Sequence, residues 1–165
     1  MTAALLPLPP LAAVLGRPRQ EALGAFAPLG WRPWSPSTPL DAERRRALNL
    51  DLTEPEVSLV GADGLRAVAN VEAGPDGLVT HLEVVATDPA EPVRLAAVLL
   101  PLGAGEPRVG GGAAAREWIW GPESGSTGEV AGEPLRLWIC AEQAYGDRLW
   151  LMASLVRRPS GDEQE

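Results

Sequence analysis

The sequence has no lysine, and it contains only one histidine, one cysteine and one tyrosine. A single cysteine, Cys140, excludes an internal disulfide and a zinc site made of several thiolates, and it fits a reducing compartment. A serine, cysteine or zinc hydrolase would need the single histidine, His81, as its base or as a metal ligand. These shortages disfavour the common hydrolase classes, and we expect no metal site and no cofactor.

Negative charge exceeds positive charge, since the formal net charge is -8 and all 14 basic residues are arginines. A protein that holds nucleic acid by neutralising phosphates needs a basic surface, so nucleic acid is a disfavoured partner. No run of about 18 apolar residues is present to span a membrane. The apolar residues 1–16 lack basic side chains and contain three prolines, so we expect no signal peptide and a cytoplasmic location.

The composition is typical of one globular domain, with 45% hydrophobic and 22% charged residues over 165 positions. We predict three segments within this domain. Residues 1–55 form a helical and proline-rich segment that packs on a sheet, residues 56–158 form a sheet-plus-helix core, and residues 159–165 form a disordered acidic tail.

Residues 133–158 are predicted to form two adjacent central strands, joined by a turn at 145–147, because apolar residues alternate on both arms. One predicted face consists of Leu135, Leu137, Ile139, Leu149, Leu151, Ala153 and Leu155. The other consists of Arg136, Trp138, Cys140, Arg148, Trp150, Met152, Ser154 and Val156. Both faces are largely apolar, so we expect this ribbon to lie in the middle of a sheet with a helix over one face.

The first 50 residues indicate short helices. Residues 10–29 are predicted to form two of them, separated at 16–18, with a shared apolar set of Leu11, Val14, Leu15, Ala22, Leu23 and Phe26. Residues 30–39 contain three prolines and two tryptophans and are expected to be a rigid surface connection. A proline after Thr38 predicts another short helix that ends near Leu48.

A two-residue period begins at Glu56 and predicts a hairpin with its turn at residues 74–77. The residues expected on its apolar face are Val57, Leu59, Leu65, Ala67, Ala69, Val71, Leu78, Thr80, Leu82 and Val84. Asp88 followed by a proline predicts a helix over 89–101, and a strand is the alternative. The predicted apolar face of that helix is Val93, Ala96, Ala97 and Leu100.

The glycine-rich residues 103–112 lack the lysine and hydroxyl of a phosphate-binding loop and are interpreted as a flexible linker. Residues 116–120 are predicted to form a short strand, and residues 121–128 a loop that is either mobile or closes over another part of the structure or a ligand.

Together these elements predict an α+β domain. It has a mainly antiparallel sheet of about five or six strands with helices on one face, in the order β-β-α-β-β-β after the N-terminal helical segment. The order from Leu65 onward is similar to that of the small sheet-and-helix modules of the roadblock, longin and profilin type, over roughly residues 64–157. The resemblance concerns topology alone, and the first 60 residues lie outside it.

Six tryptophans against one phenylalanine and one tyrosine mark the candidate surface. Trp118 and Trp120 share a strand face, and Trp138 and Trp150 are possible cross-strand neighbours. They either fill the sheet core or form a partly exposed aromatic patch, which in an acidic protein would bind a protein partner or a second copy.

The leading hypothesis is therefore a non-catalytic interaction module, as a homodimer or partner-binding protein. Its predicted surface is Trp118, Trp120, Trp138, Trp150, Arg136 and Arg148. The alternative is a small-molecule pocket or enzyme site near residues 121–128, lined by the same tryptophans with Arg136 or Arg148 as polar anchor. His81 and Glu83 share a strand face and could begin a metal site, but a solvated face is favoured. Cys140 is expected to be buried and inert.

Overall fold

The computed structural model describes residues 6–34, 56–60, 66–86, 92–100, 106–112, 115–121, 129–130, 132–142 and 148–156. Its helical segments are the 3-10 turns η1 (Leu11–Ala13) and η2 (Ala27–Leu29) and the helices α1 (Arg19–Gly24) and α3 (Pro92–Leu99). Its strands are β1 (Trp31–Pro33), β2 (Val57–Val60), β3 (Arg66–Ala73), β4 (Val79–Ala86), β5 (Arg108–Gly111), β6 (Ala115–Trp120), β7 (Glu129–Val130), β8 (Glu133–Glu142) and β9 (Arg148–Leu155).

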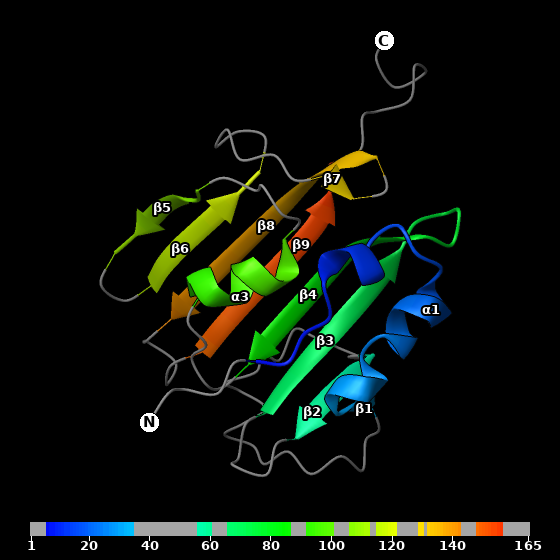
Figure 1. The fold of residues 1–165 in the computed structure, drawn as a ribbon. Coiled ribbons are helices and arrows are strands. Elements are labelled where there is room, and N and C mark those ends of the chain that lie inside the picture. The colour runs from blue at the N-terminus through cyan, green and yellow to red at the C-terminus, as the bar shows by residue number, and fades with distance from the viewer. Residues whose placement is uncertain are drawn as a thin grey trace.

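The strands form one antiparallel sheet in the order β1-β2-β3-β4-β9-β8-β6-β5, and the short β7 pairs with β8 beside this series. The β8–β9 ribbon occupies the middle of the sheet (Figure 1). The predicted central ribbon and the mainly antiparallel sheet are thus confirmed. The predicted number of five or six strands is too low, because β1, β2 and β5 extend the sheet at its two edges.

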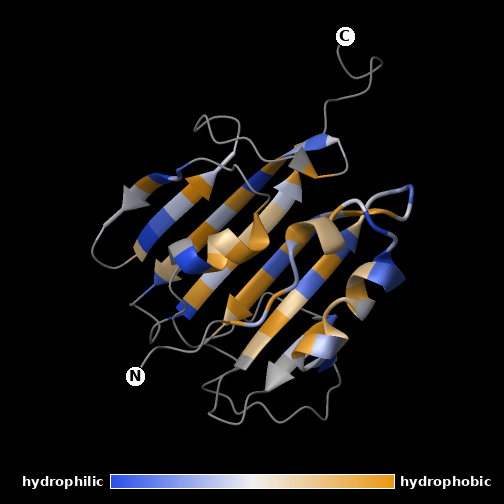
Figure 2. Cartoon of the chain, viewed as in Figure 1, coloured by the Kyte–Doolittle hydropathy of each residue, from blue (hydrophilic) through white to orange (hydrophobic). Residues whose placement is uncertain are grey.

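One face of the sheet carries the main hydrophobic core. Figure 1 shows the N-terminal helical segments and α3 in front of this face, and Figure 2 shows hydrophobic residues along the strands and on these helices. The buried cluster includes Leu11, Val14, Leu15, Ala22 and Phe26 of the N-terminal segment, Leu95, Ala96 and Leu99 of α3, and Leu82, Val84, Leu135, Leu137, Ile139, Leu149 and Leu151 of the central strands. The seven residues predicted for one face of the ribbon are all buried.

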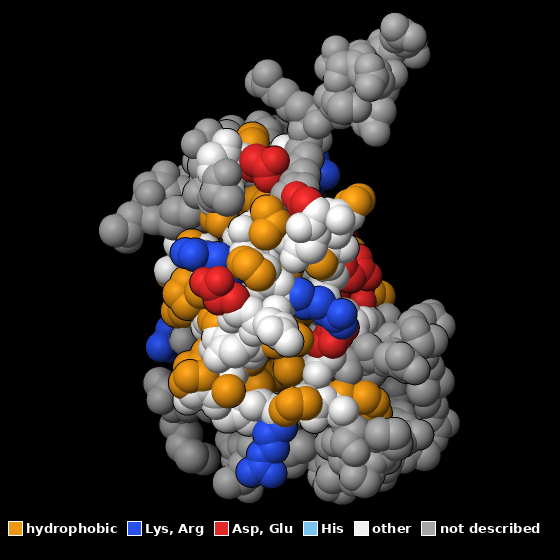
Figure 3. Space-filling view, turned by 90° about the vertical axis from the view of Figure 1, so that its right-hand side faces the viewer, with side chains coloured by type: hydrophobic (Ala, Val, Ile, Leu, Met, Phe, Trp, Pro, Cys, Tyr) orange, Lys and Arg blue, Asp and Glu red, His pale blue; other side chains and the backbone are white. Residues whose placement is uncertain are grey.

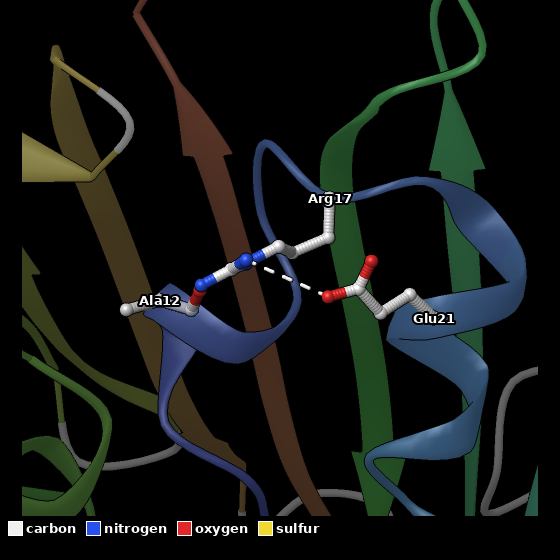
Figure 4. Close-up of polar contacts among 3 residues, drawn as sticks. All are labelled: Ala12, Arg17 and Glu21. Atoms are coloured by element: carbon white, nitrogen blue, oxygen red, sulfur yellow. Dashed lines mark hydrogen bonds and ion pairs between the residues drawn. The ribbon is translucent and has the colours of Figure 1, made fainter.

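The N-terminal segment is interrupted at residues 16–18, as predicted, and the interruption pairs with β4. The backbone N–H of Gly16 donates to the carbonyl of Val79 at 2.7 Å, and the N–H of Val79 donates to the carbonyl of Arg17 at 2.8 Å. The Arg17 side chain donates to the carbonyl of Ala12 at 3.2 Å and lies 3.5 Å from the Glu21 carboxylate, which joins η1 to α1 (Figure 4).

The segment around Trp31 is an edge strand, whereas a surface connection was predicted for residues 30–39. Trp31 is buried, because its ring meets Phe26 edge to face at a centroid distance of 5.3 Å. Its indole N–H donates to the carbonyl of Pro7 at 2.6 Å. A buried indole with a satisfied N–H anchors this edge of the sheet to the N-terminal segment.

A β-bulge changes the predicted parity at the start of β4. The β3–β4 register shifts at Glu72 and Ala73, so that Ala73 pairs with Val79 while Glu72 pairs with His81. The extra residue turns Val79 into the core and leaves Leu78 and Thr80 half-exposed. The assignment of Leu78 and Thr80 to the core parity is therefore wrong, although the hairpin and its turn are present.

The segment after β4 is the predicted helix and not the alternative strand, since α3 spans Pro92–Leu99. Its buried residues are Leu95, Ala96 and Leu99, while Ala97 is exposed. The predicted apolar face was therefore misplaced around the helix. The interpretation of residues 103–112 as a flexible linker is also corrected in part, because Arg108–Gly111 forms β5 and pairs with β6.

Several predicted features lie outside the described residues: the helix ending near Leu48, the turn at 145–147, most of the loop at 121–128, and the tail at 159–165. No helix among the described residues has the length and apolar character needed to cross a membrane.

Candidate functional site

The candidate site lies on the sheet face opposite the main core, which we call the distal face. Because cross-strand partners point to the same side, the strand registers define its members. They include Val68, Asn70 and Glu72 of β3, His81, Glu83 and Val85 of β4, Glu117 and Ile119 of β6, Arg136, Trp138, Cys140 and Glu142 of β8, and Arg148, Trp150, Met152 and Ser154 of β9.

Two tryptophans meet in the middle of the distal face. The rings of Trp138 and Trp150 lie edge to face, with centroids 5.9 Å apart and an interplanar angle of 71°. They are diagonal neighbours, because Trp138 lies opposite Met152 and Trp150 lies opposite Cys140. Such aromatic pairs contribute about 0.5 to 1.5 kcal/mol beyond the area they bury. Both indoles and Met152 are half-buried, so the centre of this face is partly open to solvent.

Each indole of this pair donates its N–H to a glutamate on the next strand outward. Trp138 Nε1 donates to Glu117 Oε1 on β6 at 3.1 Å, and Trp150 Nε1 donates to Glu83 Oε2 on β4 at 3.1 Å. A half turn about an axis through the ribbon would exchange the two indoles and the two glutamates. These charge-assisted bonds fix the orientation of both rings.

Arg148 completes one half of this arrangement. Its guanidinium carbon lies 5.3 Å from the ring centroid of Trp150, and its Nη2 lies 2.6 Å from Glu142 Oε2. The side chains of Arg148 and Glu142 are 9% and 15% exposed, so this ion pair is largely removed from water. A pair of this kind is costly to break from one side, because the remaining charge stays buried.

Cys140 lies between these groups, opposite Glu117 on one strand and Trp150 on the other. Burial raises the pKa of its thiol from 9.0 to about 11, and the carboxylates of Glu142 and Glu117 act in the same direction. The Arg148 guanidinium acts in the opposite direction and is outweighed. The thiol is therefore protonated at neutral pH and is a poor nucleophile, in agreement with the prediction of a buried cysteine.

An Arg-x-Trp pattern recurs at 32–34, 116–118, 136–138 and 148–150, and the sequence predictions missed it. Residues two apart on a strand share a face, so each arginine lies beside its tryptophan. In two of the four repeats the guanidinium stacks on the indole: Arg148 on Trp150, and Arg116 on Trp118 with 5.5 Å to the ring centroid. The repetition was a visible signal for cation–π contacts on the sheet.

The predicted surface residues divide between the two faces. Trp138, Trp150, Arg136 and Arg148 lie together on the distal face. Trp118 and Trp120 pair with Ile139 and Leu137 on the core face, where Trp120 is buried and Trp118 is half-buried. The four tryptophans therefore do not line one surface, which removes the geometric basis for a single pocket among them. Residues 122–128 of the loop invoked for that pocket lie outside the described residues.

His81 and Glu83 share the distal face, as predicted. Glu83 accepts the indole N–H of Trp150, so this carboxylate is engaged within the sheet. In the described parts of the chain, no group of three or more histidine, cysteine, aspartate or glutamate side chains is placed to hold a metal ion.

Comparison with known proteins returned no matching family model, no matching curated protein and no matching solved structure.

Proposed function

We propose that this chain is a cytoplasmic α+β interaction module, with helices against one face of the sheet and its contact surface on the other. The contact surface is the distal face around Trp138, Trp150 and Met152, and it binds a second copy of the chain or another protein. The single observation that carries this proposal is the partly exposed indole pair held at the centre of a broad sheet face.

The chemistry of this centre favours a protein contact. Tryptophan, methionine and arginine are enriched in the buried centres of protein interfaces, and tryptophan and arginine supply many of the side chains whose truncation weakens binding most. Here these residue types are neighbours on one face. The proposal depends on this grouping, because a single exposed tryptophan does not by itself indicate an interface.

Rigidity of the indoles adds to the argument. Association costs free energy when flexible side chains become ordered, at about 0.5 to 1.5 kcal/mol for each one. Trp138 and Trp150 are already oriented by their bonds to Glu117 and Glu83 and by their mutual contact. A partner that binds this face would therefore lose little free energy in ordering it.

The side of the molecule at the β1 edge differs in character. Figure 3 shows positively and negatively charged side chains interspersed with hydrophobic ones on this side. The helix side offers Val98, which is 42% exposed, as a position away from the distal face. This position provides a matched control for an interface test.

The test compares Met152→Lys with Val98→Lys by sedimentation of the purified chain over a wide concentration range, and by partner recovery from its native extract on each immobilised variant. Met152→Lys should weaken self-association or partner recovery, whereas Val98→Lys should leave both unchanged. Both variants must first show the wild-type unfolding midpoint. A monomeric wild type that recovers no partner, or equal effects of both substitutions, would contradict the proposal.

A further inference from the structure

The two halves of the indole arrangement differ in one respect. Arg148 lies opposite Glu142, and this ion pair holds the guanidinium over Trp150. The equivalent position beside Trp138 is Arg136, which lies opposite Ser154. Among the residues that the structure describes, a guanidinium is stacked on Trp150 and on Trp118, but none is stacked on Trp138.

The three carboxylates around the two indoles differ in how their charge is compensated. Glu142 is neutralised by Arg148, while Glu117 and Glu83 each receive a neutral indole N–H. Within the described ranges neither Glu117 nor Glu83 forms an ion pair. A carboxylate has about four lone-pair sites, so the bond from Trp138 leaves Glu117 able to accept further hydrogen bonds.

We propose that Trp138 and Glu117 form a seat for an arginine side chain of a partner protein. The guanidinium stacks on the indole of Trp138 and pairs with Glu117, and the alkyl part of the side chain runs between Ile119 and Met152, which flank Trp138 on the neighbouring strands. This inference rests on the proposed function and specifies what the distal face recognises.

Arginine is the cation that this seat fits best. A guanidinium is planar, stacks on aromatic faces and is more weakly hydrated than an ammonium group. The protein already uses this contact twice, at Arg148 with Trp150 and at Arg116 with Trp118. The net charge of -8 further attracts a basic partner and speeds its encounter with the chain.

The probe is an acetylated and amidated Gly-Gly-Arg-Gly-Gly peptide, with its citrulline and lysine forms for comparison. The full chain is labelled with nitrogen-15, and the peptide titration is followed by the indole N–H resonance of Trp138. We expect a saturable shift with the arginine peptide, a weaker one with lysine and none with citrulline, which keeps the shape but has no charge.

The variant Glu117→Gln keeps an acceptor for the indole and removes the charge, so it should bind the arginine peptide about tenfold more weakly. Glu21→Gln changes the net charge equally, on an exposed side chain of α1, and should bind as the wild type does. Equal binding of citrulline and arginine peptides, or equal effects of the two variants, would overturn the inference.

The two proposals fail separately. If Met152→Lys abolishes association while the arginine peptide leaves the Trp138 resonance unmoved, the distal face is an interface that does not recognise arginine. If the peptide binds but no partner and no self-association are found, the seat exists and the interaction function fails.

Discussion

Trp138 and Trp150 touch each other edge to face, yet their indole N–H groups point to glutamates on opposite sides, Glu117 on β6 and Glu83 on β4. Side chains therefore link four adjacent strands across the distal face, in addition to the backbone ladder. The distal face also has a small buried apolar cluster of Val68 and Val85, with Trp34 and Trp150 packed against it, so hydrogen bonds and apolar burial act together on this face.

Loss of one indole N–H should destabilise the protein measurably. Trp150→Phe keeps an aromatic ring but leaves the Glu83 carboxylate without its donor, so we expect a loss of about 1 to 3 kcal/mol in the free energy of unfolding. Urea unfolding followed by circular dichroism measures it. Trp118→Phe serves as control, because the Trp118 ring stacks with Arg116 and, within the part of the chain that the structure describes, makes no hydrogen bond to a glutamate. An equal loss in both variants would argue against a role for the hydrogen bond.

The Arg148–Glu142 pair should show strong coupling. Arg148→Met removes one partner of a largely buried pair, and we expect a loss of about 3 to 5 kcal/mol. Adding Glu142→Gln to this variant should recover part of the loss, because the buried uncompensated charge is gone. A double-mutant cycle by urea unfolding gives the coupling energy. The exposed pair of Arg17 and Glu21, treated in the same way, should give less than about 1 kcal/mol.

The Cys140 thiol should make stability depend on alkaline pH. Its pKa rises from 9.0 to about 11 on folding, so the native state holds its proton more tightly than the unfolded state does. The stability from this group is complete below pH 9.0 and is lost as the pH rises toward about 11. Unfolding of wild type and Cys140→Ala from neutral pH upward tests this, since the alanine variant should show a flatter profile. Profiles of equal slope would contradict it.

The turn between β5 and β6 should require glycine at one position. Gly111 has φ of +88°, and a Cβ there would lie 2.3 Å from the carbonyl oxygen of Ala115. Gly111→Ala should therefore cost about 1 to 3 kcal/mol of unfolding free energy. Gly112→Ala is the matched control, because a Cβ at Gly112 meets nothing within 4 Å. Thermal unfolding of the two variants would reveal a difference, and equal midpoints would refute the steric argument.

Alternation in the sequence was sufficient to predict the central ribbon. Leu135, Leu137 and Ile139 are buried, and Trp138 lies on the other face, because a period of two assigns faces without knowledge of the partner strand. The same rule failed at Val79, since the bulge places one extra residue between Val79 and His81 and so shifts the parity of Val79 relative to Leu82 and Val84.

The hydrogen-bond acceptors of the two indoles could not be predicted from the sequence. Trp150 and Glu83 are 67 positions apart, and Trp138 and Glu117 are 21 apart. Their contact depends on which strands become neighbours and in which register, and local patterns do not determine either. The Arg-x-Trp spacing, by contrast, is local, and two of its four occurrences form stacked pairs, so this contact was within reach of the sequence although it was not predicted.

The contact of Gly16 and Arg17 with Val79 couples the beginning of the chain to a strand more than sixty positions later. Proteolytic removal of the first 18 residues would leave the amide and the carbonyl of Val79 without these partners, at the position where the bulge already disturbs the ladder. The N-terminal segment thus tethers the β3–β4 hairpin through these two backbone hydrogen bonds. Amide hydrogen exchange at Val79 would report whether the bonds are formed.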